Sequence, residues 1–186
     1  KTLHQAQYDE DIAYESTSVL KPEQALDLIL SDKLKLRGTS LLSISDLNID
    51  QFMGIMSVAA FQHESKKKKE LGFSWEYPRS LAMIFEKPSL RTRVTFDLGM
   101  RQMGGLTTIL GPAEIGLGSR ETVPDVTRNL ERWVDAVMAR VFEHKVLVEM
   151  QNAGTIPIIN ALSDLEHPCQ ALADFYTMIR LKGKLD

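Results

Sequence analysis

Apolar and polar positions alternate in blocks along the second half of the chain, and the blocks predict strands and helices in turn. The clearest strand is the apolar run Leu81–Phe85, which ends before Pro88 because proline cannot donate a ladder hydrogen bond. A helical period begins at Ser89 and is closed by the pair Gly104–Gly105. Its apolar positions fall on roughly one face: Val94, Leu98 and Met103.

The same alternation continues to the end of the chain. Further strands are predicted at Leu106–Leu110, Asp135–Val141 and Ile156–Asn160, and a loop at Gly111–Ser119. Helices are predicted to start at Pro124, Glu143 and His167, with apolar positions that include Val126, Leu130, Trp133, Ala171, Phe175, Ile179 and Leu181. Uninterrupted alternation of this kind predicts an α/β fold in which a parallel β-sheet is covered by helices on both faces.

The first third of the chain is less regular. Residues 1–36 are predicted to form an N-terminal extension that contains an acidic patch at Asp9–Asp11 and a short helix over Pro22–Leu34. After a short apolar piece, Asp50 is predicted to cap a longer helix. Its buried positions are predicted to be Phe52, Ile55, Met56 and Ala59. The run Lys66–Lys69 suggests either a polyanion site or a solvated helix end, and we favour the second because its lysines occupy all faces of the helix.

Composition narrows the function classes. A chain of 186 residues is long enough for one domain with a sizeable core, and a net charge of −3 gives no reason to expect nucleic acid or a membrane as partner. No apolar run approaches the ~20 residues that span a bilayer, and we recognise no signal peptide. A single cysteine fits a reducing compartment, so we expect a cytoplasmic protein.

Polar groups concentrate where the first predicted strand gives way to its helix. Ser89, Arg91, Thr92 and Arg93 surround the first helical turn, where free backbone N–H groups and the positive end of the helix dipole favour an anion. The alternative is a capping serine followed by two solvated arginines. Two guanidinium and two hydroxyl groups with no acidic residue among them favour a phosphate site instead.

Two further groups lie at the ends of later strands, and ligands of open parallel sheets bind at such ends. Arg140 alone is typical of a surface group, and His167 alone is typical of a helix cap. With Pro168 suited to the first helical position, however, the His167 ring is left free, and Gln170 lies three residues further on. A histidine N–H donates to a carbonyl oxygen and a glutamine oxygen accepts from an NH₂ group, so this side suits O=C–NH₂. Carbamoyl phosphate carries both that group and a phosphate.

Two segments also resemble a known family. Pro-Ser-Leu-Arg-Thr-Arg at residues 88–93 resembles the Ser-x-Arg-Thr-Arg phosphate loop of the aspartate/ornithine carbamoyltransferase family. The segment IPIINALSDLEHPCQALAD, with MARV before it, is similar to the ornithine branch. The resemblance spans roughly Leu41 to Gly183. It implies a carbamoyl-phosphate-binding domain over residues 37–165, and a helix over 166–186 that leads toward a second, amino-acid-binding domain beyond Asp186.

The resemblance also implies roles for single residues. Those implied to bind carbamoyl phosphate are Ser89, the Leu90 amide, Arg91, Thr92, Arg93, Arg140, His167 and Gln170. Arg140, His167 and Thr92 are the implied catalytic residues, because they would polarise the carbonyl group, while Gln170 would hold the carbamoyl nitrogen. No metal or organic cofactor is implied. The implied assembly is a homotrimer in which the Gly111–Glu121 loop reaches a neighbouring site, with Glu114 as the possible contact.

The implied activity is transfer of the carbamoyl group from carbamoyl phosphate to the δ-amine of L-ornithine, giving citrulline for arginine biosynthesis. Aspartate enzymes usually carry a lysine in a Lys-Gly-Glu-Thr-like run, which Gly118–Thr122 lacks. Leu90 stands where threonine is frequent, and Glu114 where many ornithine enzymes have glutamine. The alternatives are a carbamoyltransferase for another amine or amino acid, such as aspartate, and a phosphate-binding module without catalysis. Without the second domain, we expect this chain alone to be inactive.

Overall fold

The computed structural model describes residues 22–70, 72–117 and 120–183, so residues 1–21 of the predicted 1–36 extension, with the acidic patch, lie outside the described residues. The elements in chain order are α1 (Pro22–Ser31), the 3₁₀ turn η1 (Ile44–Asp46), α2 (Ile49–Lys68), β1 (Ser80–Phe85), α3 (Leu90–Gln102), β2 (Leu106–Leu110), α4 (Pro112–Ile115), α5 (Val123–Leu130), β3 (Ala136–Arg140), α6 (His144–Ala153), β4 (Ile158–Leu162) and α7 (Pro168–Lys182).

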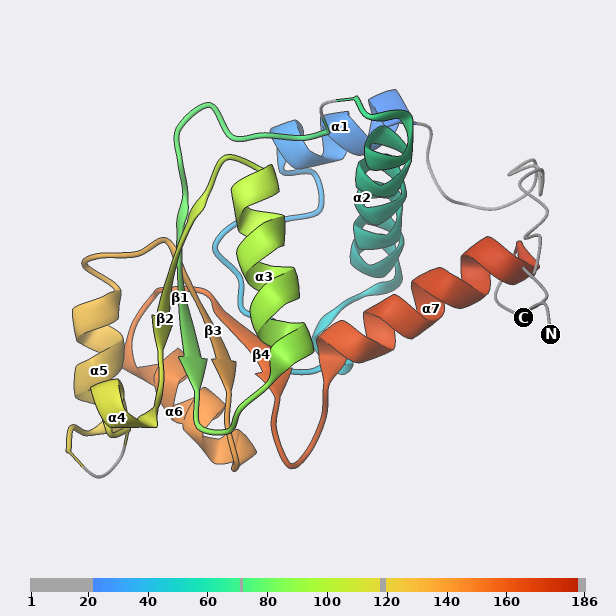
Figure 1. Ribbon diagram of the computed structural model, residues 1–186. Coiled ribbons are helices and arrows are strands. Elements are labelled where there is room, and N and C mark those ends of the chain that lie inside the picture. The colour runs from blue at the N-terminus through green and yellow to red at the C-terminus, as the bar shows by residue number, and fades with distance from the viewer. Residues whose placement is uncertain (1–21, 71, 118–119, 184–186) are drawn as a thin grey trace, which may run out of the picture.

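The strands form one parallel sheet in the order β2-β1-β3-β4, which confirms the predicted fold class. All its connections run through helices, as parallel pairing requires. Leu41 adds one parallel bridge beside Ile159 at the β4 edge. The carboxyl ends of the strands, marked by the arrowheads in Figure 1, therefore share one edge of the sheet.

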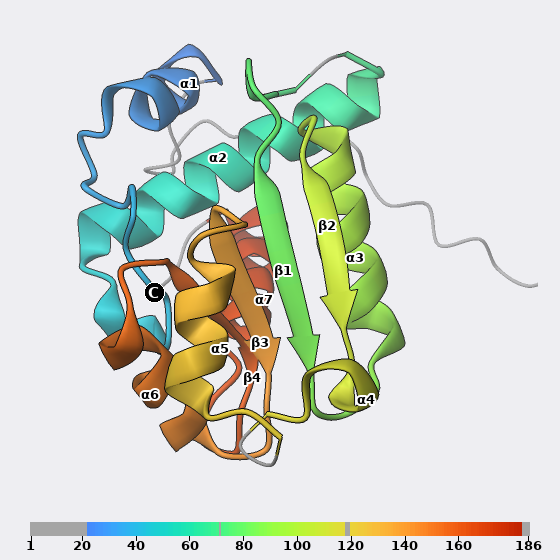
Figure 2. The same cartoon turned by 90° about the vertical axis from the view of Figure 1, so that its left-hand side faces the viewer.

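Both faces of the sheet are covered by helices, again as predicted. Figure 2 shows α5 and α6 in front of the strands and α3 and α7 behind them. One core cluster joins alternate strand residues to α5 and α6, with Val137, Leu130 and Leu147 among its members. The second cluster contains Met83 and Met138 and receives side chains from α3. The buried alternation along each strand thus places consecutive residues in different layers.

The long helix α2 begins two residues earlier than the sequence suggested. Its cap is Asn48, not Asp50: the Asn48 side chain accepts from the Gln51 amide at 2.9 Å, and the Gln51 side chain accepts from the Asn48 amide at 3.0 Å. This reciprocal pair satisfies two amides that a cap at Asp50 would leave unpaired. Of the predicted core positions on α2, Met56 is fully buried and the others are half-buried. The lysines 66–69 are exposed at its end, as expected for a solvated helix terminus.

Two apolar stretches differ from their predictions. Helix α5 ends at Leu130, so Trp133 lies outside it and is 71% exposed. On α3, Val94 and Leu98 are also exposed, because the helix turns Phe96 and Met100 toward the sheet instead. The predicted Gly111–Ser119 loop contains the short helix α4, and its residues 118–119 lie outside the described ranges. Within the described residues, no helix combines the length and apolar character that a membrane span requires.

Candidate functional site

The amino ends of α3 and α7 both lie at the edge of the sheet where the strands end (Figure 1). Strand β1 leads into α3, β4 leads into α7, and β3 lies between β1 and β4. The structure therefore brings the three sequence-predicted groups to one edge: the residues 89–93, Arg140 and the residues 167–170. This is the place where open parallel sheets bind their ligands.

Ser89 caps α3, and its hydroxyl oxygen accepts from the Thr92 amide at 3.3 Å. The capping interpretation is thus correct for Ser89, but a hydroxyl that accepts one hydrogen bond still has its proton to donate. The Leu90 and Arg91 amides occupy the first two helical positions, where no intrahelical acceptor exists. Thr92 is buried, whereas Arg91 and Arg93 are exposed and form no ion pair with any described residue. An anion at this helix end meets free donors and cationic side chains.

Arg140 ends strand β3, beside Phe85 of β1. Its carbonyl oxygen accepts from the Glu86 amide at 2.9 Å, and the Glu86 carboxylate in turn accepts from the Phe142 amide at 2.6 Å. These bonds tie the start of the β1–α3 connection to the end of β3. The Arg140 Nε atom is buried and has no hydrogen-bond partner among the residues that the structure describes.

His167 is the cap residue of α7, with Pro168 at the first helical position, and its ring makes no capping hydrogen bond. The predicted free ring is therefore confirmed. Its Nδ1 atom is buried without a partner in the described part of the chain. Burial, and next the nearby Arg140 guanidinium, lower the pKa of His167, while Asp174 opposes them weakly. The ring is thus held neutral near pH 7, with one N–H to donate and one lone pair.

Gln170 lies in the first turn of α7 and is exposed. Its amide nitrogen donates to the Asp174 carboxylate at 2.9 Å, and its amide oxygen has no partner among the described residues. That arrangement leaves an acceptor for an NH₂ group. Cys169 is mostly buried, burial raises the pKa of its thiol to about 11, and its Sγ lies 3.5 Å from the Asn160 carbonyl oxygen. A protonated, enclosed thiol is a packing group rather than a nucleophile.

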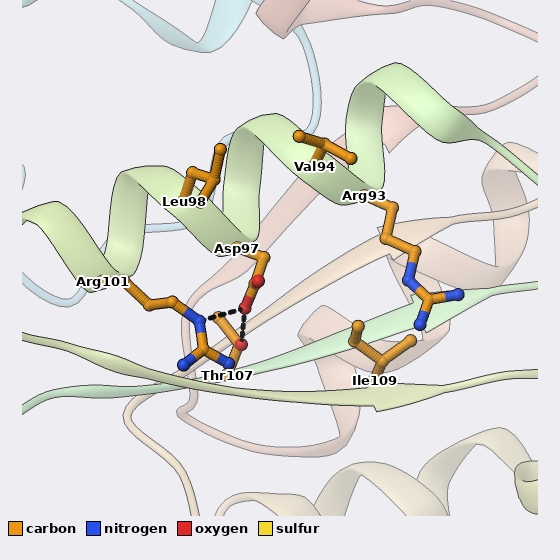
Figure 3. Close-up of a pocket in the computed structure, with 7 residues that line it drawn as sticks. All are labelled: Arg93, Val94, Asp97, Leu98, Arg101, Thr107 and Ile109. Carbon is orange, nitrogen blue, oxygen red and sulfur yellow. Dashed lines mark hydrogen bonds and ion pairs between the residues drawn. The ribbon is translucent and has the colours of Figure 1, made fainter.

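The Arg93 side chain extends from α3 toward β2, on the side of the helix that faces this strand (Figure 3). Figure 3 shows its guanidinium over Ile109 of β2, in a cavity of about 490 Å³. The remaining lining residues are Val94, Asp97, Leu98, Arg101 and Thr107. Asp97 accepts from Thr107 and, at 3.0 Å, from Arg101. The Thr107 bond, then the Arg101 bond, lower the pKa of the Asp97 carboxyl.

Glu114 lies in α4, at the end of β2, and its side chain is exposed. Its carboxylate lies against Gly111: a β-carbon at position 111 would lie 2.7 Å from the Oε2 atom of Glu114. Among the described residues, no group of three or more His, Cys, Asp or Glu side chains is placed to hold a metal ion.

Sequence reasoning missed the polar residues that hold this edge together. Asn160, in the middle of β4, is completely buried, and Glu86 links two strand ends. An asparagine inside an otherwise apolar strand is the signal that could have identified the first, since buried amides need partners.

Comparisons with known proteins agree with this geometry. A family model described as "Aspartate/ornithine carbamoyltransferase, carbamoyl-P binding domain" matches residues 39–180. The chain is 48% identical over 143 residues to an ornithine carbamoyltransferase of Deinococcus radiodurans, which covers 77% of this chain and 46% of that protein. It is 42% identical over 154 residues to one of Anoxybacillus flavithermus, covering 82% of this chain and 48% of the relative.

A solved structure gives the same result. The ornithine carbamoyltransferase of Pyrococcus furiosus superimposes with a TM-score of 0.78 at 40% identity, over 80% of this chain and 47% of that one. The chain thus spans about half the length of the relatives it matches.

Proposed function

Because the chain belongs to the aspartate/ornithine carbamoyltransferase family, we propose that it is the carbamoyl-phosphate-binding half of an ornithine carbamoyltransferase. One observation carries the proposal. Arg140 Nε and His167 Nδ1 are both buried without a partner in the described residues, at the edge where α3 presents its free amides. Buried polar atoms are rarely left unpaired, so their partners are expected to come from a ligand.

The two sides of this edge divide carbamoyl phosphate between them. The phosphate lies at the amino end of α3, against Ser89, the Leu90 amide, Arg91, Thr92 and Arg93. Arg140 reaches both the phosphate and the carbonyl oxygen. His167 and Thr92 donate to that oxygen, and the Gln170 amide oxygen accepts from the carbamoyl NH₂.

The reaction proceeds by addition and elimination at the carbamoyl carbon. The neutral δ-amine of ornithine forms a C–N bond, and the carbonyl electron pair moves onto oxygen. Arg140, His167 and Thr92 stabilise this oxyanion, in the way that placed donors stabilise tetrahedral intermediates. The C–O bond to phosphate then breaks, its electron pair leaves with the phosphate, and the attacking nitrogen loses a proton to the departing anion. The products are citrulline and inorganic phosphate.

The ornithine-binding part is proposed to lie in a second domain. The relatives named above are all ornithine enzymes, which favours ornithine over aspartate as the acceptor. We further propose a homotrimer in the cytoplasm, in which the loop after β2 carries Glu114 to a neighbouring subunit's site. The exposed position of Glu114 and the single cysteine of the chain support these two assignments.

The proposal is tested by product formation. The full-length protein should convert carbamoyl phosphate and ornithine to citrulline, and should form no carbamoylaspartate from aspartate. The 186-residue chain alone should bind phosphate in calorimetry and form no citrulline. Citrulline from the purified chain alone, or carbamoylaspartate from the full-length protein, would contradict the assignment. A full-length protein that binds phosphate but carbamoylates neither amino acid would support the non-catalytic module instead.

A further inference from the structure

Asn160 is fully buried, and its side chain ties together three separate parts of the chain. Its NH₂ group donates to the Leu42 carbonyl oxygen at 2.8 Å and to the Glu166 carbonyl oxygen at 3.2 Å. Its Oδ1 atom accepts from the Leu162 amide at 2.9 Å. A buried carboxamide with both ends satisfied fixes backbone positions strongly, because breaking any of these bonds leaves a polar group unpaired.

The hydrogen bond from the Leu162 amide to Asn160 Oδ1 lies at a shift in the register between β3 and β4. Ala139 pairs with Asn160, but Arg140 pairs with Leu162, so β4 carries one extra residue at this point. Such a bulge interrupts the ladder and redirects the strand. Leu162 has φ +148°, a conformation that side chains rarely adopt and that persists only where surrounding contacts impose it. The Asn160 side chain supplies that contact.

The turn that follows is held from several sides. The Ser163 hydroxyl accepts from the Leu165 and Glu166 amides, each at 3.3 Å, and lies 2.9 Å from Nδ1 of His144. The Glu166 carboxylate accepts from the Ile44 amide at 2.8 Å. Glu166 is thus anchored through its carbonyl, its amide and its side chain, and the next residue is His167.

We propose that Asn160 is the positioning residue for His167: by holding the Glu166 carbonyl and closing the β4 bulge, it fixes the cap of α7 so that the imidazole faces Arg140. The inference rests on the proposed function for its catalytic consequence, but the positioning itself is a property of this chain. A misplacement of about 1 Å in a catalytic group is enough to lower a rate by roughly 100-fold, so a fixed cap has a direct kinetic effect.

The position of the ring is tested by its titration in the 186-residue chain. In the wild type, NMR should show His167 titrating below the ordinary histidine value, because of burial and Arg140, with Asp174 opposing. In Asn160→Ala the released ring should titrate nearer the ordinary value. Thr127→Val is the matched control, since it removes another buried hydrogen bond, from Thr127 Oγ1 to the Val123 carbonyl oxygen at 2.8 Å, and should leave the titration unchanged.

A folded Asn160→Ala chain whose His167 titrates as in the wild type overturns the proposal. If Asn160→Ala does not fold, Asn160→Ser leaves a smaller hole and still lacks the NH₂ group, and it is judged by the same criterion. This readout needs no substrate, so it stands even if the full-length protein forms no citrulline.

A kinetic cycle in the full-length protein tests the catalytic consequence. Asn160→Ala should lower kcat about 10- to 100-fold with little change in phosphate inhibition. In the double variant, adding Asn160→Ala to His167→Ala should lower kcat by no more than about twofold further, because the imidazole through which Asn160 acts is already absent. Losses that multiply in the double variant would show a general structural defect and contradict the positioning role.

Discussion

Arg140 ends β3 and His167 caps the helix that follows the neighbouring strand β4, and each keeps one buried nitrogen without a partner among the described residues. Burial, followed by the charge of the Arg140 guanidinium, lowers the pKa of the His167 imidazole. Two buried polar nitrogens without partners would be costly in a site that served only stability. The proposed function supplies the missing partner, because a carbonyl oxygen bound at this edge would become negative during the reaction.

Arg91 and Arg93, the two exposed arginines near the amino end of α3, should differ in their contribution to phosphate binding. Arg91→Ala should weaken inorganic phosphate by about 10- to 150-fold, which corresponds to the loss of a charge-assisted bond of about 1.5–3 kcal/mol. Arg93→Ala should weaken it less, because the Arg93 side chain extends over Ile109 (Figure 3). Calorimetry on the chain measures both, with the exposed Arg132→Ala as control. Equal losses for Arg91 and Arg93 would show that the two guanidinium groups contribute equally to phosphate binding and would contradict this prediction.

The proposed trimer predicts complementation between defective subunits. Full-length subunits carrying Arg91→Ala, mixed with subunits carrying Glu114→Ala, should regain some activity, because certain hybrid sites receive neither defect. Each variant alone should stay impaired after the same dissociation and reassociation. Failure to recover activity at every mixing ratio would mean that the loop after β2 does not serve a neighbouring site.

The lowered pKa of His167 predicts how stability depends on pH. The ordinary value is 6.5, and the folded chain binds the proton less readily than the unfolded chain. The folded chain therefore has its full stability above about pH 6.5, the pKa of the unfolded histidine. It loses part of that stability as the pH falls from there through the lower pKa of His167 in the folded chain. His63, whose pKa is lowered by burial and then by Arg180, acts in the same direction.

Urea unfolding between about pH 7.5 and pH 5 should therefore show a falling free energy of unfolding. The fall should be smaller in His167→Gln and smallest when His63→Gln is added. A pH dependence identical in all three chains would contradict the lowered pKa values.

Much of the fold could be predicted because its signals are local. The apolar run ending at Phe85, the strand Leu106–Leu110 and the proline after His167 each mark a boundary that the structure confirms. The alternation of these elements was sufficient for the parallel sheet. A phosphate loop could be proposed from the sequence because its candidate donors lie within five consecutive residues, whereas Arg140 and His167 form a candidate site only when the sheet places them at one edge.

The misses come from choices that only packing decides. Asn48 and Asp50 are both good caps, and the Gln51 side chain favoured the first. No glycine or proline separates Leu130 from Trp133, so nothing local marked the end of α5. The sequence of α3 has two apolar faces, one with Val94 and Leu98 and one with Phe96 and Met100, and it is the second that packs against the sheet. The bulge at Leu162 depends on a side-chain bond from Asn160, which no strand pattern reveals.

The proposed site has a phosphate side and a carbonyl side at this edge of the sheet, and one comparison of variants in the full-length protein tests that division. His167→Ala removes a donor to an oxygen that gains charge only as ornithine attacks, so kcat should fall on the order of 10²–10³-fold, while inhibition by inorganic phosphate stays nearly unchanged. Arg91→Ala should weaken that inhibition, and His63→Ala should leave both quantities as in the wild type. If His167→Ala weakened inorganic phosphate as much as Arg91→Ala does, His167 would be a phosphate ligand and the division of the site would be wrong.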